Sequence, residues 1–354
     1  MKKLNATINK IEKIDFSLTE KTQKRLDFLT KPQGSLGKLE EFAKQVVEIT
    51  KNEKPVLNNK VVFTMAGDHG VVEEGVSLFP QEVTPQMVFN FLQQGAGINV
   101  LANHVGAKVV VVDMGVACDL EIENSRNFIN KKISLGTNNM TKGPAMIRED
   151  AVRSIEAGIE AFEEEFKNGI DICATGEMGI GNTTSSTAIT SVITGQSVED
   201  LTGRGTGIDD ERFIHKIEVI KKAININNPN PKDAIDVLSK VGGFEIGGIV
   251  GIILAAASKR VPVVIDGFIS GAAALIAFTL EPKVKDYMFA GHCSVEKGHK
   301  AMFNHIGLEP ILDLNLRLGE GTGAVLAINI IEAGIKILTQ MATFEDAGVS
   351  EGNE

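Results

Sequence analysis

The chain has 354 residues, of which 43% are hydrophobic and 23% charged, a composition that can bury a large core. The net charge of −10, the lack of a dense basic run and an aromatic content of 5% argue against a nucleic-acid partner. Three widely spaced cysteines, no apolar N-terminal segment and no apolar run near the roughly 20 residues that span a bilayer predict a cytoplasmic protein without a membrane partner.

Charged helices are predicted for the first 60 residues, with a loop at 31–37 where one proline and two glycines fall close together. After them, short apolar runs alternate with loops and amphipathic segments. Near-continuous apolar runs are typical of strands that are buried on both faces of a parallel sheet. The sequence therefore predicts an α/β fold, with a parallel sheet of about six strands and helices on both faces. The predicted strands are 61–67, 108–116, 170–175, 263–267, 287–294 and 311–318.

The last of these strands leads into an apolar segment, 324–338, whose polar residues Asn329, Glu332 and Lys336 recur every three or four positions. This spacing predicts a helix that is buried except for one polar stripe. Because the helices of the first 60 residues have no strands beside them, we expect them to pack with this C-terminal helix in a small helical lobe.

Two glycine-rich loops, 176–184 and 203–207, have the composition of anion-binding loops. Glycine allows backbone N–H groups to approach an anion closely, and the helix that follows adds the positive end of its dipole. Asn182 and Thr183 add side-chain donors to the first loop. Tight turns in a fold rich in small residues explain either loop alone at least as well. Both loops together with Lys216, on the charged helix that follows, favour a phosphorylated small molecule as the ligand.

Glu320 lies between Gly319 and Gly321, where the predicted strand passes into the helix. In an open parallel sheet, the carboxyl ends of the strands form the edge at which ligands bind. A carboxylate at this edge can act as a base, clamp a ligand, or cap the following helix, where negative charge is favourable. Position alone does not separate the base from the cap.

Several nucleotide-binding motifs are missing from the chain. It has no Gly-x-x-x-x-Gly-Lys-Ser/Thr sequence, which disfavours a P-loop kinase or ATPase. Gly176, Gly179 and Gly181 do not have the dinucleotide-binding spacing, and no acid-rich ribose-diphosphate loop is present.

The histidines do not form a recognisable metal or base motif either. His292, Cys293 and His299 lack the spacing of zinc ligands, so we expect no metal site. Asp68 and His69 could form a general-base pair, but side chains that are adjacent in sequence usually point apart, which disfavours this interpretation.

Seven strings, in order along nearly the whole chain, resemble the nicotinate-nucleotide–dimethylbenzimidazole phosphoribosyltransferase family of cobalamin biosynthesis. They include KPQGSLG at 31–37, GEMGIGNTT at 176–184 and RLGEGTG at 317–323. The others lie at 66–71, 203–207, 266–268 and 291–292.

The resemblance implies an enzyme that transfers ribose 5-phosphate from nicotinate mononucleotide to 5,6-dimethylbenzimidazole and needs no cofactor. The products would be α-ribazole 5′-phosphate and nicotinate. It also implies a homodimer in which each chain has a Rossmann-like domain, 36–324, and a small helical domain made of 1–35 with 325–354. The small domain of the partner would help to close each active site.

The same resemblance assigns roles to individual residues. Glu320 would be the general base, and Glu177 would support it in a less certain role. The aromatic base would be lined by Phe79, Gln86, Met178 and Leu318. The donor phosphate would be held by Gly179, Ile180, Gly181, Asn182, Thr183, Gly205, Lys216 and Ser294.

The expected chemistry agrees with the missing motifs. The leaving group of the donor is a pyridinium, which departs as a neutral pyridine without a metal ion or a diphosphate. Two other functions remain open at the level of the sequence. One is a sugar-phosphate kinase on the same scaffold, which would need Mg²⁺ and ATP, and the other is a non-catalytic nucleotide-binding regulator.

Overall fold

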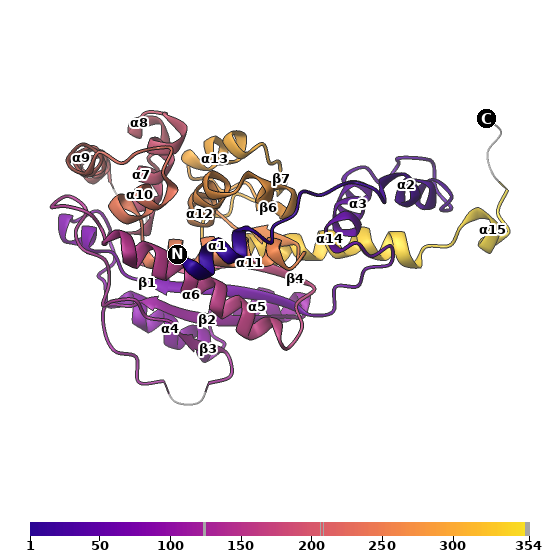
Figure 1. Ribbon diagram of the computed structural model, residues 1–354, viewed down its shortest axis with the longest axis horizontal. Helices are drawn as coiled ribbons and strands as arrows, with labels where there is room; N and C mark the ends of the chain where they lie inside the picture. Colours follow the sequence, from indigo (N-terminus) through magenta and orange to yellow (C-terminus); the bar gives the residue numbers. More distant parts are fainter. Residues whose placement is uncertain (123–124, 206, 208, 351–354) are drawn as a thin grey trace.

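A seven-stranded, all-parallel sheet forms the centre of the protein, with the strand order β3-β2-β1-β4-β5-β6-β7 (Figure 1). The computed structural model describes residues 1–122, 125–205, 207 and 209–350. The prediction of a parallel α/β sheet is confirmed, with seven strands rather than about six. The strands are β1 (Lys60–Gly67), β2 (Ala107–Gly115), β3 (Phe128–Asn130), β4 (Ile172–Met178), β5 (Val263–Ile265), β6 (Met288–His292) and β7 (Pro310–Leu312).

The direction of strand addition reverses between β1 and β4. From β1 the chain adds β2 and β3 on one side, and then β4 to β7 in order on the other side. In open α/β sheets, the crevice at such a switch point, outside the carboxyl ends of the strands, is where ligands bind. The residues that follow β1 and end β4 are therefore the first place to look for a site.

Helices cover both faces of the sheet, as the sequence predicts. On β1, the Phe63 ring packs against the Phe162 ring with centroids 6.0 Å apart, whereas its neighbour Val62 lies beside Gly321. Successive side chains of a strand point to opposite faces, so α6 and the start of α14 lie on opposite faces. The helices are α1 (Lys2–Ile8), α2 (Thr19–Asp27), α3 (Lys38–Thr50), α4 (Val83–Leu92), α5 (Gly97–Val105), α6 (Arg148–Phe166), α7 (Asn182–Thr194), α8 (Val198–Leu201), α9 (Asp210–Asn227), α10 (Ala234–Val241), α11 (Phe244–Ser258), α12 (Phe268–Leu280), α13 (Gly298–Ile306), α14 (Thr322–Gln340) and α15 (Phe344–Ala347), with short 3₁₀ helices at Gly70–Glu74 and Pro282–Tyr287.

Two predicted strands differ from the structure by three residues or more at one end. The predicted strand 311–318 is wrong beyond Leu312, where β7 ends, because Asn315 adopts a left-handed φ of 54° that interrupts an extended chain. Leu314 and Leu318 are more than half exposed, at 52% and 59%. The alternating apolar residues therefore belong to an exposed segment at the sheet edge and not to a buried strand. In contrast, β4 extends to Met178, so part of the predicted glycine loop belongs to a strand.

The N- and C-terminal segments meet at the far end of α14 (Figure 1). The Thr30 N–H donates to the Ala342 carbonyl at 3.1 Å, and the Phe344 N–H donates to the Phe28 carbonyl at 3.0 Å. Helix α3 packs along α14, while α1 packs against α6 and α11. The proposed division of the chain into 36–324 and a small domain from both termini stays a prediction.

Helix α14 is the one helix among the described residues with the length and apolarity that would allow it to cross a membrane, and 56% of it is buried in the protein. Asn329 and Lys336 are exposed, as is Gln340 at its end, and Glu332 is partly exposed, as the predicted polar stripe requires. The stripe and the burial indicate a core helix that packs against the sheet and α3.

The close crossing of α6 and α11 gives a stability prediction. A Cβ atom at Gly158 would lie 2.1 Å from the Gly248 carbonyl oxygen, so the helix backbones must separate in Gly158→Ala. The variant gains helix propensity of about 1 kcal/mol, but we expect overpacking to exceed this gain and lower the free energy of unfolding by about 1–3 kcal/mol. Denaturant titration measures the change. Glu164→Ala, on the exposed face of α6, should stay within about 0.5 kcal/mol, and an equal effect of both variants would contradict the prediction.

Candidate active site

Glu320 lies in a turn of three successive residues with positive φ, namely 85° at Gly319, 64° at Glu320 and 100° at Gly321. A non-glycine residue in this region is uncommon, and such strain persists only where the surroundings hold it. The Thr64 hydroxyl donates to the Glu320 carbonyl at 3.2 Å. A Cβ atom at Gly176 would lie 2.2 Å from the same carbonyl oxygen. Through Thr64 of β1 and Gly176 of β4, the turn is in direct contact with both strands.

Asp266, directly after β5, caps the helix that follows this turn. Its carboxylate accepts hydrogen bonds from the N–H groups of Gly321 at 3.2 Å, Gly323 at 2.8 Å and Ala324 at 2.9 Å. These are first-turn donors of α14, which have no partner within the helix. The capping role that the sequence allowed for Glu320 on α14 therefore belongs to Asp266.

The Glu320 carboxylate instead faces the start of α5. Its Oε2 accepts a hydrogen bond from the Ile98 N–H at 3.0 Å, and the residue is only 5% exposed. Burial raises the pKa of Glu320, the negative charge of Asp266 raises it further, and the Ile98 N–H opposes the rise. A buried carboxylate that has a raised pKa and one amide donor is a competent proton acceptor.

Glu177, near the end of β4, lies directly beneath the Glu320 turn. Its Oε1 occupies the space where a Gly319 side chain would lie, and its Oε2 accepts a hydrogen bond from the Asn182 amide. Burial, followed by the nearby charges of Asp266 and Glu245, raises the pKa of Glu177 to about 8. Glu177 therefore carries a proton at neutral pH.

Five of the residues predicted to hold a phosphate come together at the start of α7. The Lys216 Nζ donates to the Thr183 hydroxyl at 2.7 Å, and a Cβ atom at Gly205 would lie 3.2 Å from each of these two atoms. Helix α7 follows Gly181, whose φ of 95° favours glycine, and this N-cap residue has no side chain to cap the helix. Asn182 and Thr183 form its first turn, so its positive end is available for an anion.

Lys216 is almost completely buried, at 1% exposure. Burial lowers its pKa to about 8, and the carboxylate of Glu296 opposes the fall. The buried Ser294 lies in the loop after β6, which is joined to the 313–318 segment by a hydrogen bond from the Val295 N–H to the Leu316 carbonyl.

The residues predicted for the aromatic base are less fully assembled. Leu318 lies beside the start of α5, where its Cδ2 atom would be 2.9 Å from a Cβ atom built on Gly97. Met178 is the last residue of β4. Phe79 and Gln86 are exposed, before and within α4. This helix approaches the predicted phosphate loop, since the Ile180 N–H donates to the Thr84 hydroxyl at 3.2 Å. Gly179 is also close, with its α-carbon packed on the Gly67 carbonyl.

Sequence reasoning missed the roles of Asp266, Glu245 and Ile98. Asp266 was visible as an acid that follows a strand, the position of a ligand or a cap. Glu245 is a single acid in an otherwise apolar helix, which is itself a signal of a buried polar partner. The Ile98 N–H has no sequence signal, because only the fold brings α5 to the turn. Thr206, within the second predicted glycine loop, lies outside the described residues.

The described histidines do not lie in a cluster of metal ligands. Among the described residues, no group of three His, Cys, Asp or Glu side chains could hold a metal ion. His292 and His299 lie with ring centroids 5.9 Å apart, and burial lowers the pKa of His299 to about 3. Asp68 accepts from the Ala117 N–H, whereas His69 pairs with Glu245, so Asp68 and His69 have separate partners.

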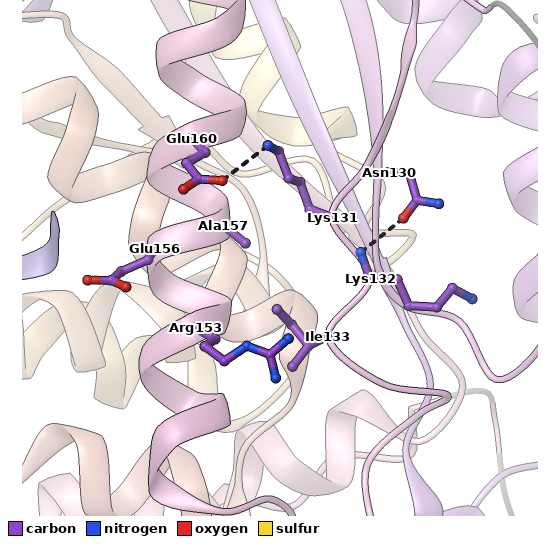
Figure 2. A pocket seen from close by; sticks show the side chains of 8 residues that line it. All are labelled: Asn130, Lys131, Lys132, Ile133, Arg153, Glu156, Ala157 and Glu160. Atoms are coloured by element: carbon purple, nitrogen blue, oxygen red, sulfur yellow. Dashed lines mark hydrogen bonds and ion pairs between the residues drawn. The ribbon is translucent and has the colours of Figure 1, made fainter. Parts of the chain in front are cut away.

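Away from this site, a cavity of about 310 Å³ lies between α6 and the chain that leaves β3 (Figure 2). Its cations already have partners, because Lys131 pairs with Glu160 at 3.1 Å and Lys132 pairs with Asp113 at 3.2 Å. These ion pairs favour a surface cleft over a second anion site.

Comparisons with known proteins agree with this geometry. Residues 11–349 match the model of a family described as phosphoribosyltransferase. The chain belongs to this family. It is 57% identical over 352 residues to the nicotinate-nucleotide–dimethylbenzimidazole phosphoribosyltransferase of Geotalea uraniireducens, covering 99% of each chain. It is also 57% identical over 350 residues to the enzyme of that name from Geobacter sulfurreducens, again over 99% of each chain.

Solved structures are similar over nearly the full length. The crystal structure of CobT from Thermus thermophilus superposes with a TM-score of 0.90 and 42% identity, covering 95% of this chain and 99% of that one. A second structure from that organism, titled as the nicotinate-nucleotide–dimethylbenzimidazole phosphoribosyltransferase, has a TM-score of 0.88 and 41% identity, with the same coverage. The family predicted from the seven sequence strings is confirmed.

The raised pKa of Glu177 predicts a pH-dependent stability difference. The folded chain holds this proton up to a pH of about 8, whereas an unfolded glutamate loses it near 4.5. The folded state therefore binds more protons in this window, and wild-type stability falls as the pH rises from about 4.5 to 8. Glu177→Gln keeps an acceptor for Asn182 but has no such loss.

We expect the stability of Glu177→Gln relative to wild type to increase by roughly 3–5 kcal/mol between these pH values. Denaturant titrations at pH 4.5, 6 and 8 measure the difference. Parallel pH profiles for the two proteins would contradict a buried, protonated Glu177.

Proposed function

We propose that the protein transfers ribose 5-phosphate from nicotinate mononucleotide to 5,6-dimethylbenzimidazole, giving α-ribazole 5′-phosphate and nicotinate with inversion at the anomeric carbon. The observation that carries the proposal is the buried Glu320 carboxylate on its strained turn, at the switch point of the sheet. The names of the close relatives support the choice of reaction. The kinase and regulator alternatives have no structural observation in their favour.

The donor binds through its phosphate at the N-terminus of α7. The side chains of Asn182, Thr183, Lys216 and Ser294 and the backbone of 179–181 and Gly205 surround the anion. The helix dipole and the buried ammonium act on the same group, and both are strengthened by exclusion of water. This fixed anchor sets the position of the ribose relative to Glu320.

The acceptor binds with its ring against Met178 and Leu318, and with Phe79 and Gln86 at the outer side. The lone pair of one ring nitrogen attacks C1′ of the ribose from the face opposite the nicotinate. The bond between C1′ and the pyridinium nitrogen breaks, and its electron pair neutralises the pyridinium. Attack from the opposite face converts the β-riboside into the α-riboside.

Glu320 takes the proton that the new bond makes acidic. Once the attacking nitrogen is bonded to carbon, the ring is cationic, and its other N–H transfers the proton to the Glu320 carboxylate. The raised pKa of Glu320 makes it a stronger base than an exposed carboxylate. Glu177, protonated beneath the same turn, supports the position of Glu320 without adding a second negative charge.

The protein acts as a cytoplasmic homodimer that needs no cofactor. Exposed apolar residues support a partner surface, because Leu314 and Leu318 lie at the edge of the sheet beside the site. A largely apolar groove between the start of β7 and α3 is a second candidate for this surface. It is lined by Leu36, Lys38, Leu39, Phe42, Glu309, Pro310, Ile311 and Ile330.

Glu320→Gln tests the proposed base. The substitution keeps an acceptor for the Ile98 N–H but cannot take a proton from the benzimidazole. We expect kcat to fall by about 10²–10⁴, with the melting temperature and the affinity for nicotinate mononucleotide nearly unchanged. Product formation from nicotinate mononucleotide and dimethylbenzimidazole, identified by mass, provides the rate.

Glu164→Gln, at an exposed carboxylate of α6 outside this groove, is the matched control and should keep the wild-type rate. A Glu320→Gln variant that folds normally and retains more than about a third of wild-type kcat would rule out a general base, whose loss costs far more.

Lys216→Met tests the phosphate anchor. The side chain keeps its apolar length but loses its charge, so we expect the KM for nicotinate mononucleotide to rise at least about tenfold, as for a charge-assisted hydrogen bond, with little change in the KM for the base. Because the pKa of Lys216 is about 8, wild-type affinity for the donor should also weaken as the pH rises above 8, whereas the affinity of the variant should not follow this change.

Steady-state kinetics at pH 7 and pH 9 measure both effects. Lys221→Met is the control, because Lys221 lies on the same helix but is exposed and pairs with Glu199. Equal rises in the two KM values would show that Lys216 stabilises the fold and does not bind the donor.

A further inference from the structure

Three polar side chains form a buried relay behind the start of α7. The His69 Nε2 atom lies 2.7 Å from Glu245 Oε1, and the His69 Nδ1 atom lies 3.0 Å from the Ser185 hydroxyl. Each of the three residues is at most 1% exposed. The three side chains bond one another, and the Ser185 Oγ atom also lies 4.0 Å from Met140 Sδ. None of these contacts reaches a residue assigned to either substrate, despite the similarity to a serine–histidine–acid arrangement.

The relay connects three elements that meet at the switch point. His69 follows β1, Ser185 lies in the first turns of α7, and Glu245 lies in the first turn of α11. His69 also packs under the glycine that starts α7, since a Cβ atom at Gly181 would lie 3.2 Å from the His69 Cβ atom. The relay therefore fixes the end of the helix that presents Asn182 and Thr183.

The hydrogen-bond roles follow from the chemistry of the partners. The Glu245 carboxylate can only accept, so the His69 Nε2–H donates to it, and the neutral ring then has an acceptor at Nδ1. The Ser185 O–H donates to this nitrogen. Nearby hydroxyls of α7 bond back to their own helix, as Thr187 does to the Thr183 carbonyl and Thr190 does to the Ser186 carbonyl. Ser185 instead points out of α7 toward β1.

Glu245 is placed where its negative charge is favourable. It lies next to the N-terminus of α11, a 15-residue helix whose dipole favours an anion. Its Oε2 atom has no partner among the described residues, so His69 is its one hydrogen-bond partner there. Such a buried carboxylate costs free energy that a purely structural contact would avoid, which favours a role in fixing the imidazole.

We propose that His69 is a positioning residue for the donor phosphate, which holds the start of α7 through Ser185 while Glu245 fixes its tautomer and orientation. This inference rests on the proposed function, because it assigns the relay to the phosphate site of that reaction. His69 touches neither substrate. Its effect is confined to the donor, since α7 carries no residue of the pocket assigned to the aromatic base.

Two substitutions of His69 separate the two ends of the relay. An asparagine places its amide oxygen near the position of Nδ1 and can accept from Ser185, whereas a glutamine places its amide N–H near Nε2 and can donate to Glu245. We expect His69→Gln and Ser185→Ala to raise the Kd for nicotinate mononucleotide about five- to tenfold, the effect of one lost hydrogen bond. His69→Asn should stay within about twofold, since the bond to Ser185 is kept.

Isothermal calorimetry with nicotinate mononucleotide, beside kcat and the KM for dimethylbenzimidazole, measures the effect. The kcat at saturating donor and the KM for the base should stay near wild type in all three variants. Ser186→Ala is the matched control, because its hydroxyl lies one position along the same helix and has no partner among the described residues. Melting temperatures separate folding from binding, and if His69→Asn melts early, Glu245→Gln in the same chain should restore it.

Unchanged donor affinity in His69→Gln and Ser185→Ala, with only a lower melting temperature, would overturn the inference and leave a structural relay. A loss of affinity in His69→Asn but not in His69→Gln would overturn it as well, because the end at Ser185 would then be irrelevant. If wild type binds nicotinate mononucleotide but forms no product, the proposed function fails, while the Kd values still decide the role of His69.

Discussion

The contact on which the site depends is that of the Asp266 carboxylate with the first N–H groups of α14. Each hydrogen bond alone contributes about 1 kcal/mol, but together they fix where the helix begins. The strained turn before the helix then has only one position, above Gly176 and Glu177. Glu320 can occupy an unfavourable backbone conformation because Thr64 and Asp266 hold the carbonyl and the N–H of the peptide group between Glu320 and Gly321.

Burial and the nearby charges of Asp266, Glu245 and Glu320 raise the pKa of Glu177, and burial and the charge of Asp266 raise the pKa of Glu320. Burial and mutual repulsion disfavour full ionisation, so the site keeps at least one proton that an exposed cluster would lose. This arrangement suits a reaction whose acceptor becomes cationic for a moment. The negative charge that remains attracts the cation, while the protonated Glu177 limits the repulsion that would otherwise open the turn.

Sequence patterns predicted the parts that depend on local periodicity. The runs at 61–67 and 108–116 are strands whose residues are buried on both faces, and 324–338 is a helix, as the three- and four-residue spacing of its polar side chains predicts. The run at 311–318 begins with the same alternation but lies at the sheet edge, where β7 ends at Leu312 and Asn315 adopts a left-handed conformation. The contact of His69 with Glu245 joins residues 176 positions apart, so no local pattern could have revealed it.

Helix α14 connects two parts of the molecule that are usually considered separately. Its 19 residues form a rod of about 28 Å, with the proposed base at one end and the segments near both chain termini at the other. Helix α3 packs along this rod, and the Arg25 guanidinium of α2 donates to the Leu338 and Met341 carbonyls at its far end. One rigid element therefore supports both the turn that carries Glu320 and the outer surface near the two chain termini.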